Sequence, residues 1–95
     1  MRVATAIRAR LTEALAPERL EIEDESARHA GHAGARPEGE SHFRLVVVAA
    51  AFEGKGRVER QRLVFSALDD LMRTDIHALS IRALTPAEAA GAARP

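Results

Sequence analysis

The feature that most constrains the fold is a strand–helix–strand pattern in the second half of the chain. Residues 42–52 are rich in valine and alternate as a strand does. The turn residues Gly54 and Gly56 separate them from a helical spacing of apolar residues over about 57–73, and a further apolar run covers 76–84. A helical crossover between two strands of one sheet predicts that the two strands run parallel.

The first part of the chain predicts one more helix and one more strand. Apolar residues recur at helical spacing from residue 2 to about residue 15, and Pro17 closes this run. Residues 20–24 alternate and are expected to form a short strand, antiparallel to the strand at 42–52. The predicted fold class is therefore α+β: a three-stranded mixed sheet with helices on one face and the other face open.

The C-terminal end predicts a short helix followed by a tail. Thr85 is in the position of an N-cap, Pro86 takes the first helical position and Glu88 completes a capping box. We therefore expect one domain over residues 1–88 and a flexible tail over residues 89–95.

Composition excludes several classes of function. The 95 residues include 14 basic and 14 acidic side chains, so the overall charge gives no support for a nucleic-acid partner. There is no cysteine, which excludes disulfides, thiolate ligands and cysteine nucleophiles within the chain. The longest apolar stretch is too short for a membrane span and the N-terminus lacks the apolar core of a secretory signal, so we expect a cytoplasmic protein with no membrane partner. No P-loop, dinucleotide fingerprint or activated-nucleophile motif occurs, which predicts a protein that is not an enzyme.

The four histidines are the residues that suggest chemistry, because histidine is the commonest metal ligand. His29 and His32 lie in a glycine-containing segment, 27–40, that is expected to form a loop. His42 precedes the central strand, on the face opposite Phe43, and His77 precedes the last strand. Three of them have a plainer interpretation: His77 as the cap of a strand start, His29 as a solvated loop residue, and His42 as a structural residue.

The chain resembles the BolA-like protein family in a series of short motifs that run from the first helix to about Glu88. These are Glu25-Ser26-x-x-His29, Ser41-His42-Phe43-Arg44, Phe52-Glu-Gly54, Arg60-x-Arg62-Leu-Val64, Ile76-His77-Ala-Leu79 and Thr85-Pro86. The resemblance implies an αββαβ(α) sandwich likened to class II KH domains, which agrees with the element order expected above. The chain departs from the family pattern at Gln61, where the family usually has a histidine between two arginines.

The resemblance implies that the protein is a non-enzymatic adaptor in iron–sulfur cluster assembly and trafficking. Such an adaptor shares a [2Fe-2S] cluster with a monothiol glutaredoxin and its glutathione. By resemblance His77 is the ligand from the strand and His29 the ligand from the loop, with His32 as an alternative to His29. Imidazole ligands on one iron of such a cluster alter its potential. Because the chain has no cysteine, no cofactor is expected on the isolated chain.

A second hypothesis is a DNA-binding transcriptional regulator, since the family has members described in that way. Lys55, Arg57, Arg60 and Arg62 form a basic cluster on a turn and a helix start, which fits either phosphate contacts or an ordinary solvated face. A third interpretation is a protein–protein module that uses the open sheet face. The sequence leaves open the choice among these interpretations, the effect of Gln61, and whether the chain forms a homodimer.

Overall fold

The computed structural model describes residues 2–25 and 42–92. The loop expected over 27–40, with His29 and His32, lies outside the described residues. The elements are α1 (Arg2–Leu15), β1 (Arg19–Asp24), β2 (His42–Val48), the 3-10 turn η2 (Ala50–Phe52), α2 (Arg57–Ala67), α3 (Asp69–Thr74), β3 (Ala78–Leu84) and α4 (Pro86–Ala92). No helix within these residues is both long and apolar enough to span a bilayer.

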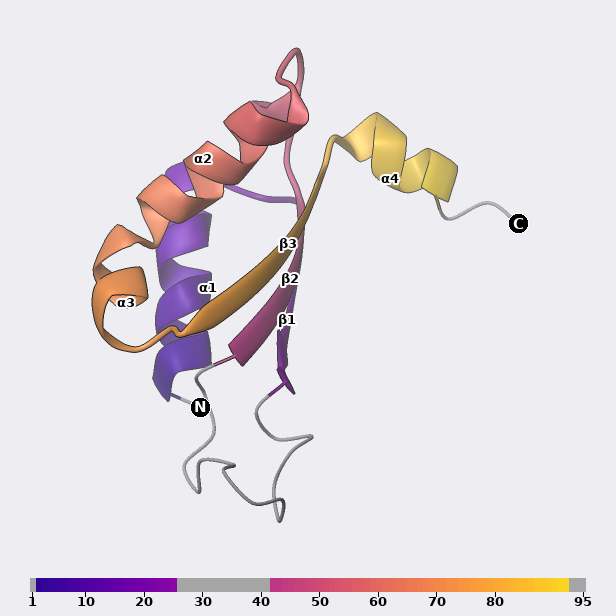
Figure 1. The fold of residues 1–95 in the computed structure, drawn as a ribbon. Coiled ribbons are helices and arrows are strands. Elements are labelled where there is room, and N and C mark those ends of the chain that lie inside the picture. The colour runs from indigo at the N-terminus through magenta and orange to yellow at the C-terminus, as the bar shows by residue number, and fades with distance from the viewer. Residues whose placement is uncertain (1, 26–41, 93–95) are drawn as a thin grey trace.

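The three strands form one mixed sheet in the order β1-β2-β3. β1 runs antiparallel to β2, with Leu20 opposite Val47, and β2 runs parallel to β3, with His42 opposite Ala78. Helices α1, α2 and α3 lie on one side of this sheet, while α4 leaves the end of β3 and extends away from that helical layer (Figure 1). The α+β class and the mixed sheet are therefore confirmed.

The core lies between the sheet and the helical layer. Alternate residues of β2 point into it, and α1 contributes one residue per turn because its apolar positions recur every three or four residues. The buried side chains of this core are those of Val3, Ala4, Ile7, Leu11, Leu15, Phe43, Leu45, Val47, Ala49, Phe52, Val64, Leu68, Leu71 and Ile76. The opposite face of the sheet carries exposed charged side chains, among them Glu21, Arg44 and Arg82.

The central strand is shorter than the valine-rich pattern predicts. β2 ends at Val48, and the chain turns into η2 instead of continuing as a strand to Phe52. The N–H of Ala49 still bonds the carbonyl of Leu84, and the N–H of Phe52 then bonds the carbonyl of Ala49. This turn buries the Phe52 ring completely in the core. The last residues of the expected strand therefore form a turn that buries an aromatic ring, which is favourable because it removes apolar surface from water.

The helix expected over 57–73 is divided at Leu68, which has φ −105° and ψ 13° and separates α2 from α3. Leu68 itself is buried, so the change of direction occurs at a core residue. Val58, one of the apolar residues in the helical spacing over 57–73, is 61% exposed, whereas Val64 is 0% exposed. Six residues at 100° per residue place these two valines about 120° apart around the helix. Of these two valines, only Val64 faces the core.

The C-terminal helix runs past the boundary expected at residue 88. The capping box is present, because the Thr85 hydroxyl accepts a hydrogen bond from the N–H of Glu88 at 3.1 Å and the Glu88 carboxylate accepts one from the N–H of Thr85 at 2.9 Å. α4 then continues to Ala92, so helix rather than tail follows Glu88 over residues 89–92.

Candidate functional site

His77 lies in the connection that enters β3, at the end of the sheet where β2 also begins. Strand alternation predicts that it shares a face with Leu79 and Ile81, which are half-buried against the helices. The strand begins only at Ala78, however, so His77 lies outside the regular pleat and is exposed. The preceding residue, Ile76, is buried and its N–H bonds the carbonyl of Leu71. The imidazole is therefore accessible on a fixed backbone.

His42 is the neighbour that the structure gives to His77. It is the first residue of β2, is exposed, and its ring centroid lies 6.3 Å from that of His77 with the two planes at 68°. Its place on the face opposite Phe43 is as expected. His29 and His32 lie outside the described residues, so their position relative to His77 stays a prediction. Over residues 2–25 and 42–92, no group of three or more metal-binding side chains occurs.

In the basic cluster, Arg60 serves the fold. Its side chain is 15% exposed, and its Nε donates to the carbonyl of Lys55 at 2.8 Å. Its Nη1 donates to the carbonyl of Ala83 at 3.2 Å and to the Glu88 carboxylate at 2.6 Å. A guanidinium with three internal partners has little capacity left for an external phosphate.

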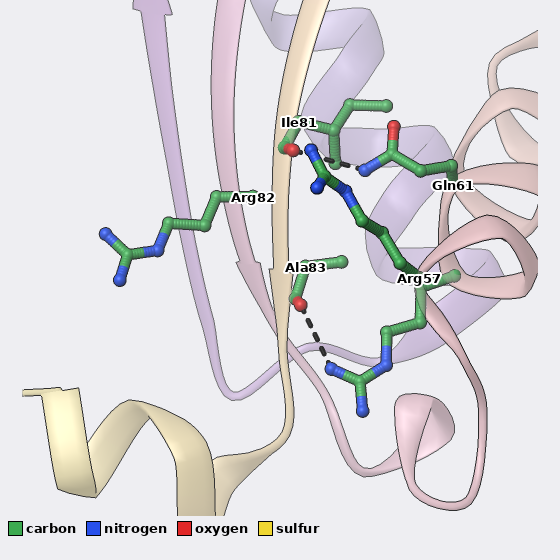
Figure 2. Close-up of a pocket in the computed structure, with 6 residues that line it drawn as sticks. Arg57, Gln61, Ile81, Arg82 and Ala83 are labelled. Atoms are coloured by element: carbon green, nitrogen blue, oxygen red, sulfur yellow. Dashed lines mark hydrogen bonds between the residues drawn. The ribbon is translucent and has the colours of Figure 1, made fainter.

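The other members of the basic cluster have fewer internal partners than Arg60. Arg57 and Arg62 are exposed and Lys55 is half-buried, and none of the three forms an ion pair with the described residues. A cavity of about 190 Å³ lies between α2 and β3, lined by Arg57, Arg60, Gln61, Ile81, Arg82 and Ala83. Arg57 extends along it toward Ile81, whereas Arg82 points away to the opposite side of β3 (Figure 2).

Gln61, which stands where the family usually has a histidine, protects the edge of the sheet. Its Nε2 donates to the carbonyl of Ile81 at 3.2 Å (Figure 2), two residues before the carbonyl that Arg60 satisfies. β3 is an edge strand, and unpaired backbone groups on such strands are a site for unwanted association. No motif in the sequence marks this role, because it depends on the packing of α2 against β3.

Two carboxylates, those of Glu88 and Asp70, have lowered pKa values. The hydrogen bond from Arg60, followed by that from the Thr85 N–H, lowers the pKa of Glu88 to about 2. The hydrogen bond from Arg10, which joins α1 to α3 at 2.9 Å, lowers the pKa of Asp70. Both shifts stabilise the charged form, so these groups hold elements together and do not act as proton donors near neutral pH.

Comparison with known proteins finds one family that matches most of the chain. The family described as BolA-like protein matches residues 11–88. The chain is 48% identical over 86 residues to BolA-like protein 1 of Mus musculus, which covers 90% of this chain and 60% of the mouse protein. The solution structure of BolA1 from Mus musculus superposes with a TM-score of 0.81 at 43% identity, covering 100% of this chain and 74% of that one.

A plant protein contains a similar domain as one part of a longer chain. The chain is 49% identical over 86 residues to SufE-like protein 1 of Arabidopsis thaliana, which covers 86% of this chain and 23% of the plant protein. The structure of the BolA domain of SufE1 from Arabidopsis thaliana gives a TM-score of 0.75 at 48% identity, covering 88% of this chain and 92% of that domain. The chain thus spans less than two thirds of both full-length relatives.

Proposed function

The chain belongs to the BolA-like protein family, and on that premise we propose that it is a non-enzymatic adaptor in iron–sulfur cluster assembly and trafficking. It shares a [2Fe-2S] cluster, as cargo, with a monothiol glutaredoxin. The observation that carries this proposal is the exposed imidazole of His77 on a fixed backbone, in a chain that has no cysteine. The partner and its glutathione supply the thiolates, and this chain supplies imidazole.

The donor chemistry of the chain fits half of a cluster site. Iron–sulfur clusters are held by thiolates, and two histidines can replace two cysteines on one iron. His77 is the donor at the entry to β3, and His29 or His32 is the donor from the loop. The isolated chain offers no thiolate, so a stable cluster requires the complex. Imidazole ligation on the iron that faces this chain raises the potential of the cluster.

The test is a reconstituted complex of this chain with a monothiol glutaredoxin and glutathione. We expect His77→Ala to change the visible circular dichroism of the cluster and to speed its loss, since one iron loses its fixed ligand. His29→Ala and His32→Ala, made singly, decide which loop histidine takes part. Arg8→Ala, an exposed change on α1, is the control.

Folding and partner binding are measured separately, by far-ultraviolet circular dichroism and by co-elution of the cluster-free proteins. A His77→Ala complex that forms normally and keeps both the wild-type spectrum and the wild-type lifetime of the cluster overturns the ligand assignment.

A second candidate function is DNA binding, favoured by the exposed guanidinium groups of Arg57 and Arg62 at the start of α2. We expect duplex DNA affinity, followed by fluorescence anisotropy, to fall with salt. Each phosphate contact removed, as in Arg57→Ala or Arg62→Ala, lowers the slope of log affinity against log salt by about 0.9. Arg8→Ala removes the same charge elsewhere and is the control. Absence of binding at low salt eliminates this function.

A further inference from the structure

Two exposed imidazole rings meet at the end of the sheet where β2 and β3 begin. The parallel register pairs His42 with Ala78, and His77 directly precedes Ala78 in the chain. The ring centroids of His42 and His77 are 6.3 Å apart. We propose that this pair binds one divalent transition-metal ion when the chain is free of any partner.

The spacing of the two rings is close to what one ion requires. Imidazole nitrogen binds zinc at about 2.0–2.1 Å, which places the ring centroid roughly 3.2 Å from the ion. Two imidazoles on a tetrahedral ion therefore have centroids roughly 5 Å apart, and two on opposite sides of an ion roughly 6.4 Å apart. The observed 6.3 Å lies within this range, near its upper end. Rotation of exposed side chains, which occurs within nanoseconds, lets the two rings turn their nitrogens toward one ion.

The backbone holds the pair in place. His42 is followed by Phe43, and His77 is preceded by Ile76, and both of these neighbours are buried in the core. The two Cα positions are therefore fixed by the packing of the sheet, while the rings remain exposed. Ligands on a fixed backbone lose little conformational entropy when an ion binds.

The donor set selects the kind of ion. Two neutral imidazole nitrogens favour Cu²⁺, Ni²⁺ and Zn²⁺ over Mg²⁺ and Ca²⁺, and Cu²⁺ is bound most tightly in the usual order of affinities. Within residues 2–25 and 42–92 no third metal-binding side chain joins the pair, and we expect water in the remaining coordination positions. Such a site is weaker than a structural site with four protein ligands.

This site uses His77, as the proposed cluster does, but it needs neither glutaredoxin nor sulfide. The experiment therefore uses the full chain alone, titrated with Cu²⁺, Ni²⁺ or Zn²⁺ chloride in a non-chelating buffer and followed by calorimetry. We expect one ion per chain, with Cu²⁺ bound most tightly. His42→Gln and His77→Gln should each weaken binding by roughly tenfold or more, because each leaves a single imidazole.

The control is the double variant His29→Gln and His32→Gln, which removes the other two histidines and should keep the wild-type affinity. Thermal unfolding of each variant shows that the fold is intact. Binding that survives His42→Gln, or that is lost in the double variant, overturns the assignment, as does absence of binding to the wild-type chain. The glutaredoxin proposal is tested by the cluster spectrum of the complex, which this titration does not use, so the two proposals can fail separately.

Discussion

Arg60 and Glu88 form a two-point ion pair that joins the start of α2 to the start of α4. The guanidinium Nη1 and Nη2 lie 2.6 and 3.3 Å from the two carboxylate oxygens. The same guanidinium holds the carbonyl of Ala83, and the same carboxylate caps the N–H of Thr85. One pair of side chains therefore ties the end of β3 to both flanking helices.

The first prediction concerns Arg60. Arg60→Ala should lower the free energy of unfolding by about 1–2 kcal/mol, because partly buried backbone carbonyls lose their donor. Arg60→Lys keeps the charge but not the forked geometry, so its free energy of unfolding should lie between those of the wild type and Arg60→Ala. Urea denaturation gives the measurement. Arg57→Ala, an exposed arginine on the same helix, should stay within about 0.5 kcal/mol of the wild type. Equal losses in both alanine variants would contradict this role.

The second prediction concerns the pH dependence of stability. The pKa of Glu88 is lowered from its ordinary 4.5 to about 2 in the folded chain. Its contribution is therefore complete above pH 4.5 and is lost as the pH falls toward 2, since the unfolded state binds the proton first. Glu88→Gln should remove this part of the profile, measured by thermal unfolding over that range.

Asp70, whose pKa is also lowered, contributes to the same acid loss of stability. The difference between wild type and Glu88→Gln isolates the carboxylate of Glu88. Glu53→Gln removes an exposed carboxylate that is not paired with Arg60 and serves as the control. Wild-type and Glu88→Gln profiles that stay parallel from about pH 5 to about pH 2 would be inconsistent with the Arg60 contact.

The third prediction concerns the edge of β3. Gln61→Leu keeps the approximate size of the side chain but removes the donor to the carbonyl of Ile81. We expect a loss of about 1 kcal/mol in the free energy of unfolding, and faster hydrogen exchange near the C-terminal half of β3. Arg62→Leu, on the next residue and exposed, is the matched control and should leave exchange in β3 unchanged. Faster exchange in both variants would argue against a specific edge contact.

The fourth prediction compares two valines on one helix. Val64→Ala should lower the free energy of unfolding by about 2–3 kcal/mol, since it leaves a cavity in the core. Val58→Ala makes the same chemical change on the exposed side and should cost less than about 0.5 kcal/mol. Chemical denaturation of the two variants measures the difference. Similar losses would mean that α2 does not turn Val64 inward and Val58 outward.

The mixed sheet was predictable because its causes are local. Alternation over residues 42–48 and helical spacing after Gly56 follow directly from neighbouring residues, and the crossover then determines the parallel pairing. The end of β2 was not predictable in this way. The apolar run continues past Val48 through three alanines to Phe52, yet the chain turns into η2 there and buries the Phe52 ring.

For the candidate site, too, some features can be recognised in the sequence and others depend on the tertiary structure. Histidines stand out in a sequence, but it is the resemblance to the BolA-like family that singles out His77 among the four. Its neighbour His42 could not be recognised as such, because the pair forms only through the register of two parallel strands. The same limit applies to the basic cluster, where Arg57 and Arg60 look alike in sequence but only Arg60 turns inward to Ala83 and Glu88.

The sequence by itself determined the order of the elements, the mixed sheet and a chain that can offer imidazole but no thiolate to a metal. These properties depend on composition and on periodicities of two and of three to four residues, which are local. The tertiary structure decided which side chains meet: His42 with His77, Gln61 with the edge of β3, and Arg60 with Glu88. Such contacts depend on strand register and on the rotation of α2, which are set by packing of the whole core.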